Sequence, residues 1–137
     1  MPNFDSLTAT LARFAGELTP AAIPASVKAR IALHFIDSLG CGIAGGEDSV
    51  LRKSARVIRS QYATGRSVAL DGGTPLSASG AAFLNAAAIN ALDYDDGFEV
   101  AGRGMGHPGA TLVAGALAAV GQGGPVSGGA LLTSLVA

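Results

Sequence analysis

The sequence predicts an all-α protein, a multi-helix array in which residues 1–137 form a single domain. Apolar residues recur at helical spacing along nearly the whole chain. Alanine is abundant in the segments expected to lie inside, where small side chains let helices approach closely. Charged residues make up 14% of the chain, against roughly 25% in an average soluble domain. This low fraction fits part of a larger assembly better than a free-standing domain.

Three helices are predicted in the first half of the chain. Residues 7–18 carry one apolar stripe, and Asp5 or Ser6 can cap the helix that they form. Residues 24–45 are apolar on more than one face, which predicts a central and largely buried helix. A third helix, over residues 48–62, is expected to point its basic side chains outward.

The second half predicts three more helices. A short extended piece at residues 67–73 precedes an alanine-rich helix over residues 77–92, for which we expect an interior position. Residues 93–108 form an acidic loop. A fifth helix covers about residues 110–120, and Ser127 begins a sixth.

The end of the chain carries no charged side chain, since no Lys, Arg, Asp or Glu follows Arg103. A solvated domain carries charge on its outer faces, so we expect residues 104–137 to lie inside a larger assembly. Because residues 131–137 show no cap, glycine or proline that would end a helix, we expect the chain to be the N-terminal part of a longer protein.

Composition disfavours several classes of function. Cys41 is the single cysteine, which excludes an internal disulfide and any zinc site or iron–sulfur cluster built mainly from thiolates of this chain. The net charge is −1 and the chain has no basic stripe beyond one helix face, so we expect no nucleic-acid partner. The N-terminus lacks signal-peptide features, and residues 110–120 are too few to span a bilayer. We therefore expect a cytoplasmic protein without a membrane partner.

Polar residues on two predicted helices need partners. His34 lies among apolar neighbours and is interpreted as a core or interface histidine, and Asp37 is expected to hydrogen-bond a neighbouring helix end. Asn85 and Asn90 need hydrogen-bond partners if they are buried. Asn90 lies one turn before Asp93, so it can support the acidic loop.

The acidic loop is the candidate functional site. It concentrates carboxylates and one of the two histidines in a few residues, namely Asp93, Asp95, Asp96, Glu99 and His107. Mutual repulsion gives folding little reason to place these acids together, whereas ligand binding or proton transfer does.

Two interpretations of this loop have weak support. Asp93-x-Asp95 resembles the opening of a calcium loop, but Gly97 comes one position too early for an EF-hand. A metal-dependent hydrolase that uses Asp93, Asp95 and His107 is a rival hypothesis. The glycines of residues 104–109 match the glycine pattern of dinucleotide-binding proteins. However, no apolar strand precedes them, and the nearby carboxylates would repel a pyrophosphate.

For this loop we therefore expect neither a bound metal ion nor a cofactor.

Acid/base catalysis on a small carboxylic acid is the interpretation that we favour. His107 stands just before a helix and can exchange protons near neutral pH. Asp93 can orient its ring or bind a substrate hydroxyl, and Arg103 can pair with a substrate carboxylate. Asp96 is a second candidate for substrate binding. The competing structural interpretation is that Asp93 and Asp96 brace the loop and that His107 is a turn residue.

The same residues carry a resemblance to a known family. The run at residues 85–96, Asn-Ala-Ala-Ala-Ile-Asn-Ala-Leu-Asp-Tyr-Asp-Asp, followed by His107-Pro108, resembles the MmgE/PrpD family. Members include 2-methylcitrate dehydratase, cis-aconitate decarboxylase and iminodisuccinate epimerase. Residues 37–45 are similar to the signature of the family's second helix.

This resemblance has implications for fold and chemistry. It implies a homodimeric enzyme with a large helical domain and a smaller α/β lid domain, which is absent from this chain. It also implies that Asp93 and His107 are active-site residues that act without an iron–sulfur cluster. The expected activity is that of a lyase on a small hydroxy-di- or tricarboxylate, like the 2-methylcitrate dehydratase of propionate metabolism.

Several alternatives stay open within and outside the family. The reaction can be decarboxylation or epimerisation, and Gly97 departs from the threonine common in members with the dehydratase or decarboxylase pattern. The family's later lysine and histidine site residues lie beyond Ala137, so we expect this chain alone to be inactive. A non-catalytic, truncated helical module that binds a partner is the alternative from another class.

Overall fold

The computed structural model describes residues 6–137, and these residues form a mainly helical domain. The described part of the chain contains six α-helices: α1 (Leu7–Glu17), α2 (Ala25–Gly45), α3 (Ser49–Gln61), α4 (Ala78–Asn90), α5 (Pro108–Val120) and α6 (Gly128–Val136). The other elements are a 3-10 helix, η1 (Pro20–Ala22), and three short strands, β1 (Thr64–Ser67), β2 (Phe98–Val100) and β3 (Arg103–Gly106). The predicted all-α class is confirmed, and the β2–β3 hairpin is an addition to it.

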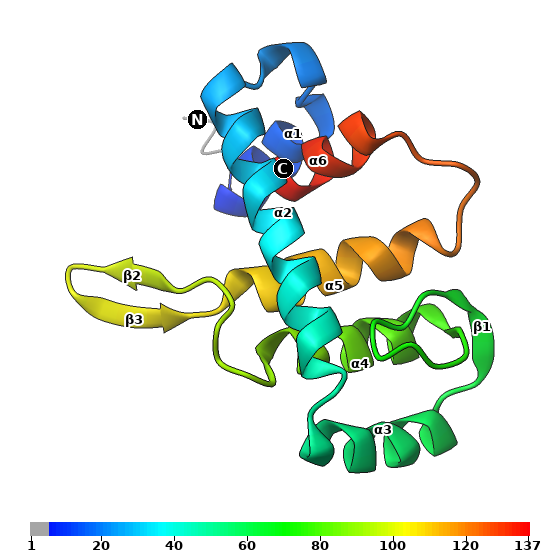
Figure 1. Ribbon diagram of the computed structural model, residues 1–137. Helices are drawn as coiled ribbons and strands as arrows, with labels where there is room; N and C mark the ends of the chain where they lie inside the picture. The colour runs from blue at the N-terminus through cyan, green and yellow to red at the C-terminus, as the bar shows by residue number, and fades with distance from the viewer. Residues whose placement is uncertain (1–5) are drawn as a thin grey trace.

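The helices are arranged around a central pair. Helices α4 and α5 pack side by side, and the long helix α2 crosses both (Figure 1). Helix α3 packs on α4, whereas α6 lies near the other end of α2 and contacts α2, α5 and η1. The β2–β3 hairpin projects away from the helices (Figure 1). None of the described helices combines the length and apolar character needed to cross a membrane.

Helix ends follow the local capping signals in the sequence. The Ser6 side chain accepts a hydrogen bond from Ala9 N at 3.2 Å, so Ser6 is the N-cap of α1. Asp5, the alternative cap, lies outside the described residues. Ser127 caps α6 in the same way, with its Oγ 3.1 Å from Ala130 N.

Removing the cap of α3 is expected to destabilise the domain by about 1 kcal/mol. Asp48 Oδ1 accepts hydrogen bonds from Val50 N and Leu51 N, both at 2.9 Å. Asp48→Ala leaves these two N–H groups without an acceptor, and Leu51 belongs to the core. Urea unfolding of the 137-residue chain measures the loss. Asp48→Asn keeps an oxygen acceptor and serves as the control; an equal loss in both variants would exclude the cap as its cause.

The core consists of two neighbouring clusters that share α4. One cluster joins α3, α4 and the C-terminal part of α5 to the segment around β1. Its buried members are Leu51, Ala55, Ile58, Ala69, Leu76, Ala81, Leu84, Ala88 and Ala118. The second joins α4 to α5 through Ile89, Ala110, Val113 and Ala114. Most of the members are alanines, which let the helices approach closely. The interior position predicted for α4 is therefore confirmed.

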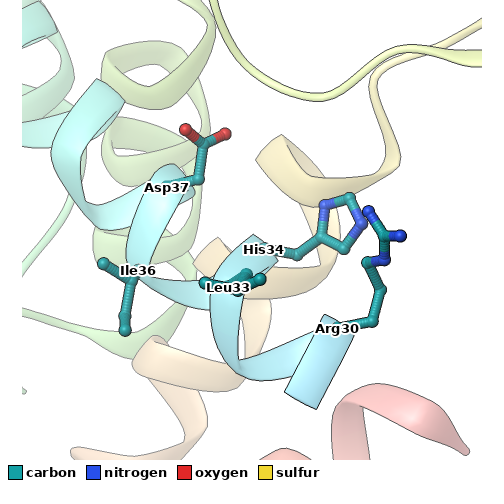
Figure 2. Close-up of a pocket in the computed structure, with 5 residues that line it drawn as sticks. All are labelled: Arg30, Leu33, His34, Ile36 and Asp37. Atoms are coloured by element: carbon teal, nitrogen blue, oxygen red, sulfur yellow. The ribbon is translucent and has the colours of Figure 1, made fainter. Parts of the chain in front are cut away.

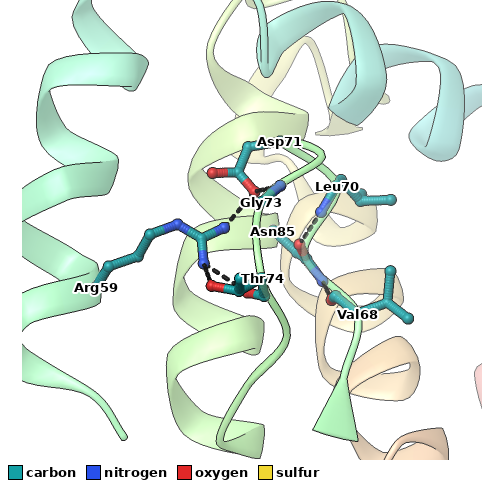
Figure 3. Close-up of polar contacts among 7 residues, drawn as sticks. All are labelled: Arg59, Val68, Leu70, Asp71, Gly73, Thr74 and Asn85. Atoms are coloured by element: carbon teal, nitrogen blue, oxygen red, sulfur yellow. Dashed lines mark hydrogen bonds and ion pairs between the residues drawn. The ribbon is translucent and has the colours of Figure 1, made fainter. Parts of the chain in front are cut away.

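A buried asparagine fastens the segment after β1 to α4 (Figure 3). Asn85 is fully buried, its Oδ1 accepts from Leu70 N and its Nδ2 donates to Val68 O, each at 2.8 Å. The expectation that Asn85 needs partners is met by these two backbone groups. Arg59 of α3 holds the same segment from the other side, with Nη2 2.6 Å from Asp71 Oδ1. The acidic loop therefore begins at the end of a firmly held helix.

Helix α2 is central but less buried than its sequence pattern predicts. Leu33 and Ile36 are each 64% exposed, and Ile43 is 61% exposed. Apolar residues on several faces of a helix indicate that other structural elements cover those faces, but they do not identify these elements. Within residues 6–137, α4 and α5 cover one side of α2, and this apolar face stays open.

Candidate active site

A sharp turn and a hairpin build the acidic loop. Asp93 follows α4 in the left-handed region, with φ of 54°, and its N–H donates to Asn90 O at 3.1 Å. The residues that follow stay close to the helix end, where Asp95 contacts Asn90. Strand β2 then leads outward and β3 leads back, with Phe98 paired to Gly106 at the base. The hairpin thereby returns His107 to the end of α4, although it lies 14 positions after Asp93 in the sequence.

His107 lies between two carboxylates. Its Nδ1 is 3.2 Å from Asp95 Oδ1, and its Nε2 is 3.5 Å from Asp93 Oδ1. The imidazole is 37% exposed and the Asp93 side chain is 83% exposed, whereas the Asp95 side chain has no exposed surface. One face of the cluster is therefore open to a small molecule, and the other is closed.

Asp95 is the residue that the sequence interpretation underrated. The sequence interpretation gave it a role of its own only as a metal ligand. The structure buries it and anchors it to α4, because Asn90 Nδ2 donates to its two oxygens at 3.2 and 3.4 Å. The support of the loop by Asn90 was expected. Nothing in the local sequence distinguishes Asp95 from Asp93 or Asp96, because its burial and its contact with Asn90 arise only in the folded loop.

Asp96 has a structural role at the start of α5. Its Oδ1 accepts from Gly109 N at 2.8 Å, so this carboxylate satisfies a free N–H of the helix and lies against the positive end of its dipole. A Cβ on Gly109 would overlap this carboxylate, which explains the glycine. The bracing interpretation is thus correct for Asp96. Substrate binding by Asp96 stays a prediction, since one of its oxygens is already engaged.

Arg103 is separated from the other site residues. It pairs with Val100 beside the turn of the hairpin, four residues before His107 along an extended strand. At strand spacing this corresponds to about 13 Å between the two backbones. The structure therefore brings together Asp93, Asp95 and His107. Asp96, in the same loop, is hydrogen-bonded to the start of α5, and Arg103 is left at the hairpin tip.

A surface hollow lies on α2 beside the acidic loop (Figure 2). It has a volume of about 400 Å³ and is lined by Arg30, Leu33, His34, Ile36 and Asp37. Asp37 points into this open region rather than to a helix end (Figure 2). A second, mainly apolar hollow of about 190 Å³ reaches from His34 to Asp96 and the start of α5. His34 is thus half-buried at the edge of two hollows rather than inside the core.

Cys41 is expected to react slowly with thiol reagents near neutral pH. Burial raises the pKa of its thiol, and the carboxylates of Asp37, Asp95 and Asp96 raise it further, so less thiolate is present. Asp37→Asn should speed alkylation by iodoacetamide, because it removes one of the charges that raise this pKa. Mass spectrometry of the labelled chain measures the rate. Glu47→Gln is the control and should leave the rate unchanged; equal rates in all three proteins would refute the electrostatic explanation.

The cluster has some capacity to hold a cation. One donor atom each from Asp93, Asp95 and His107 lies within 4.8 Å of the others. However, the two carboxylates face different nitrogens of the ring. A histidine gives only one nitrogen to a metal ion, so this placement suits hydrogen bonding and proton transfer at the ring better than chelation.

Fold and site together define a class of protein: a helical domain that presents an imidazole between two carboxylates at a helix N-terminus. The chain belongs to the MmgE/PrpD family, because the family model for the MmgE/PrpD N-terminal domain matches residues 9–137. The match covers every described helix except the first residues of α1. No curated protein and no solved structure gives a significant match to the chain.

Proposed function

We propose that this chain is the helical part of a lyase that removes water from a small hydroxy-di- or tricarboxylate, as 2-methylcitrate dehydratase does. Membership of the MmgE/PrpD family supports the reaction class. The single observation that carries the assignment of the site is the position of His107 between Asp93 and Asp95. By the same resemblance, we propose a cytoplasmic homodimer that serves propionate metabolism and needs no cofactor.

The proposed elimination divides the work between two residues. His107 takes the proton from the carbon next to a substrate carboxylate, and the electron pair of the broken C–H bond forms the new C=C bond. The hydroxyl on the neighbouring carbon leaves as water after it accepts a proton, either the one that His107 has just taken or one from solvent. Asp93, which is exposed beside Nε2 of His107, binds or orients that hydroxyl. Both groups must act on the open side of the cluster, where the substrate can reach them.

The charge balance of the loop limits how a polyanion can bind. Asp93, Asp95 and Asp96 all repel substrate carboxylates, so binding requires cationic groups. Arg103 is our candidate on this chain for binding a substrate carboxylate. Its side chain would have to extend along the hairpin toward His107. We therefore propose that other parts of the full enzyme supply further cations and that this chain alone does not turn over.

Two other reactions of the family use the same proton transfer. Epimerisation returns the proton to the opposite face of the carbon, and decarboxylation releases CO2 and protonates the carbon. Gly97 bears on this choice, because a Cβ there would meet no other atom and the structure has room for the family's threonine. Packing therefore does not require glycine at position 97. Its effect is that the site lacks a threonine hydroxyl that could contact a substrate.

A substrate screen in D2O tests the proposal. The chain, and the longest polypeptide that its gene encodes, are incubated with 2-methylcitrate, citrate, cis-aconitate and iminodisuccinate and followed by proton NMR. Elimination yields an alkene signal, epimerisation yields deuterium at the carbon with retained hydroxyl or amine, and decarboxylation yields a product with one carboxylate fewer. We expect the alkene.

The outcomes of this screen separate the alternatives. Activity that a chelator abolishes and a divalent metal restores would favour the metal-dependent hydrolase. Absence of all three conversions, in a preparation that contains every domain encoded by the gene, would refute the proposed function and favour a module that only binds a partner.

A further inference from the structure

We propose that Asp95 is a positioning residue that holds His107 in its Nδ1–H tautomer and leaves Nε2 as the atom that exchanges a proton with the substrate. The part of this inference that concerns the substrate rests on the proposed function. The part that concerns the tautomer rests only on the geometry around the ring.

The first step is the state of the Asp95 carboxylate. It has no exposed surface, and Asn90 donates to its oxygens. A buried carboxylate is stable as an anion only if its oxygens accept hydrogen bonds or meet a positive charge. Asn90 supplies one donor group, and the ring nitrogen at 3.2 Å is the other polar group in position to donate.

The second step is the difference between the two ring nitrogens. Nδ1 of His107 is buried and makes no hydrogen bond of good geometry, although Asp95 Oδ1 lies 3.2 Å away. The distance already lies within hydrogen-bond range, and a small rotation of the ring would align the N–H with the carboxylate oxygen. Nε2 faces the exposed Asp93 instead. A substrate can therefore reach Nε2 but not Nδ1.

The third step follows from hydrogen-bond chemistry. An ionised carboxylate only accepts, so Asp95 requires a proton on Nδ1. In the neutral ring Nε2 then carries the free electron pair and can act as a base. Once Nε2 takes a proton, the imidazolium lies between two carboxylates, which stabilises its charge. Asp95 thus acts through His107 and touches no substrate.

The test is 15N NMR of the imidazole nitrogens in the 137-residue chain, at a pH at which the ring is neutral. The chain has two histidines, so a His34→Gln variant assigns the signals of His107. We expect the Nδ1–H tautomer in the unchanged chain. In Asp95→Asn the amide oxygen can accept from Asn90 while the amide N–H faces Nδ1, so we expect the Nε2–H tautomer.

Controls separate positioning from general disturbance of the fold. Asp93→Asn changes the exposed partner only and should leave the Nδ1–H tautomer in place. If Asp95→Asn does not fold, Asn90→Ala removes the anchor of Asp95 and should produce a mixture of tautomers. The Nε2–H form in the unchanged chain, or the Nδ1–H form in folded Asp95→Asn, would overturn the proposal.

The NMR readout needs no turnover, so it distinguishes failure of this inference from failure of the proposed function. Where the substrate screen finds turnover, Asp95→Asn should lower kcat by about 10²-fold, the lower end of what a proton-transfer group contributes, with little change in KM. An unchanged kcat together with a reversed tautomer would show that His107 does not transfer the proton.

Discussion

Gly45→Ala is expected to lower the free energy of unfolding by about 3 kcal/mol, the upper end of the usual cost of overpacking. Gly45 is the last residue of α2 and lies directly against α4. A Cβ there would overlap the backbone oxygen of Ala88, and a backbone atom cannot turn aside as the end of a side chain can. The two helices must therefore separate at their crossing, which disturbs the helix that ends at the acidic loop.

Gly40→Ala is the matched control in the same helix. A Cβ at Gly40 meets nothing within 4 Å, and the position is exposed. Alanine there should stabilise the chain by about 0.5–1 kcal/mol, because glycine loses more conformational freedom when it enters a helix. Urea unfolding followed by far-UV circular dichroism compares the two variants. Equal and small effects would show that the crossing of α2 and α4 is looser than described.

His107→Ala is expected to lower turnover by about 10²- to 10⁴-fold, the range for loss of a proton-transfer group. The side chain is partly exposed and its loss leaves no core cavity, so folding should be preserved. The measurement is the rate of product formation in the assay that the substrate screen identifies, with circular dichroism as a check of the fold. Retained turnover would remove His107 from the mechanism.

Two variants control for this experiment. His34→Gln removes the other histidine and should leave turnover unchanged. Glu99→Gln removes one negative charge from the hairpin, so it reports how much of any effect comes from the charge of the loop alone. A fall in turnover as large in Glu99→Gln as in His107→Ala would assign the effect to charge rather than to proton transfer.

The helices and their caps could be predicted because the patterns that indicate them involve residues close together in the chain. Ser6 and Ser127 each accept a hydrogen bond from a backbone N–H in the first turn of the following helix, and Ala81 and Ala88 of α4 lie in the core. The hairpin was missed because its strands are only three and four residues long and two of the four residues of β3 are glycine. Its turn also uses Ala101 at φ of 50°, a left-handed position that alanine rarely signals.

The position of the candidate site could be predicted from the sequence, but the roles of its individual residues could not. The density of carboxylates near His107 pointed to the correct loop. The roles of the individual carboxylates could not be separated, because Asp95 and Asp96 differ only in which neighbour each one meets. Asn90 makes Asp95 a buried partner of the ring, and Gly109 makes Asp96 a brace for α5.

By itself the amino-acid sequence determined the helical class, the caps, the family and the segment that carries the chemistry, because these depend on periodicity and on residues close together in the chain. Only the tertiary structure decided the burial of Asp95, the meeting of His107 with Asp93, the distance of Arg103 and the open face of α2. Those properties depend on where a left-handed turn, a hairpin and a helix crossing place residues that are far apart along the chain.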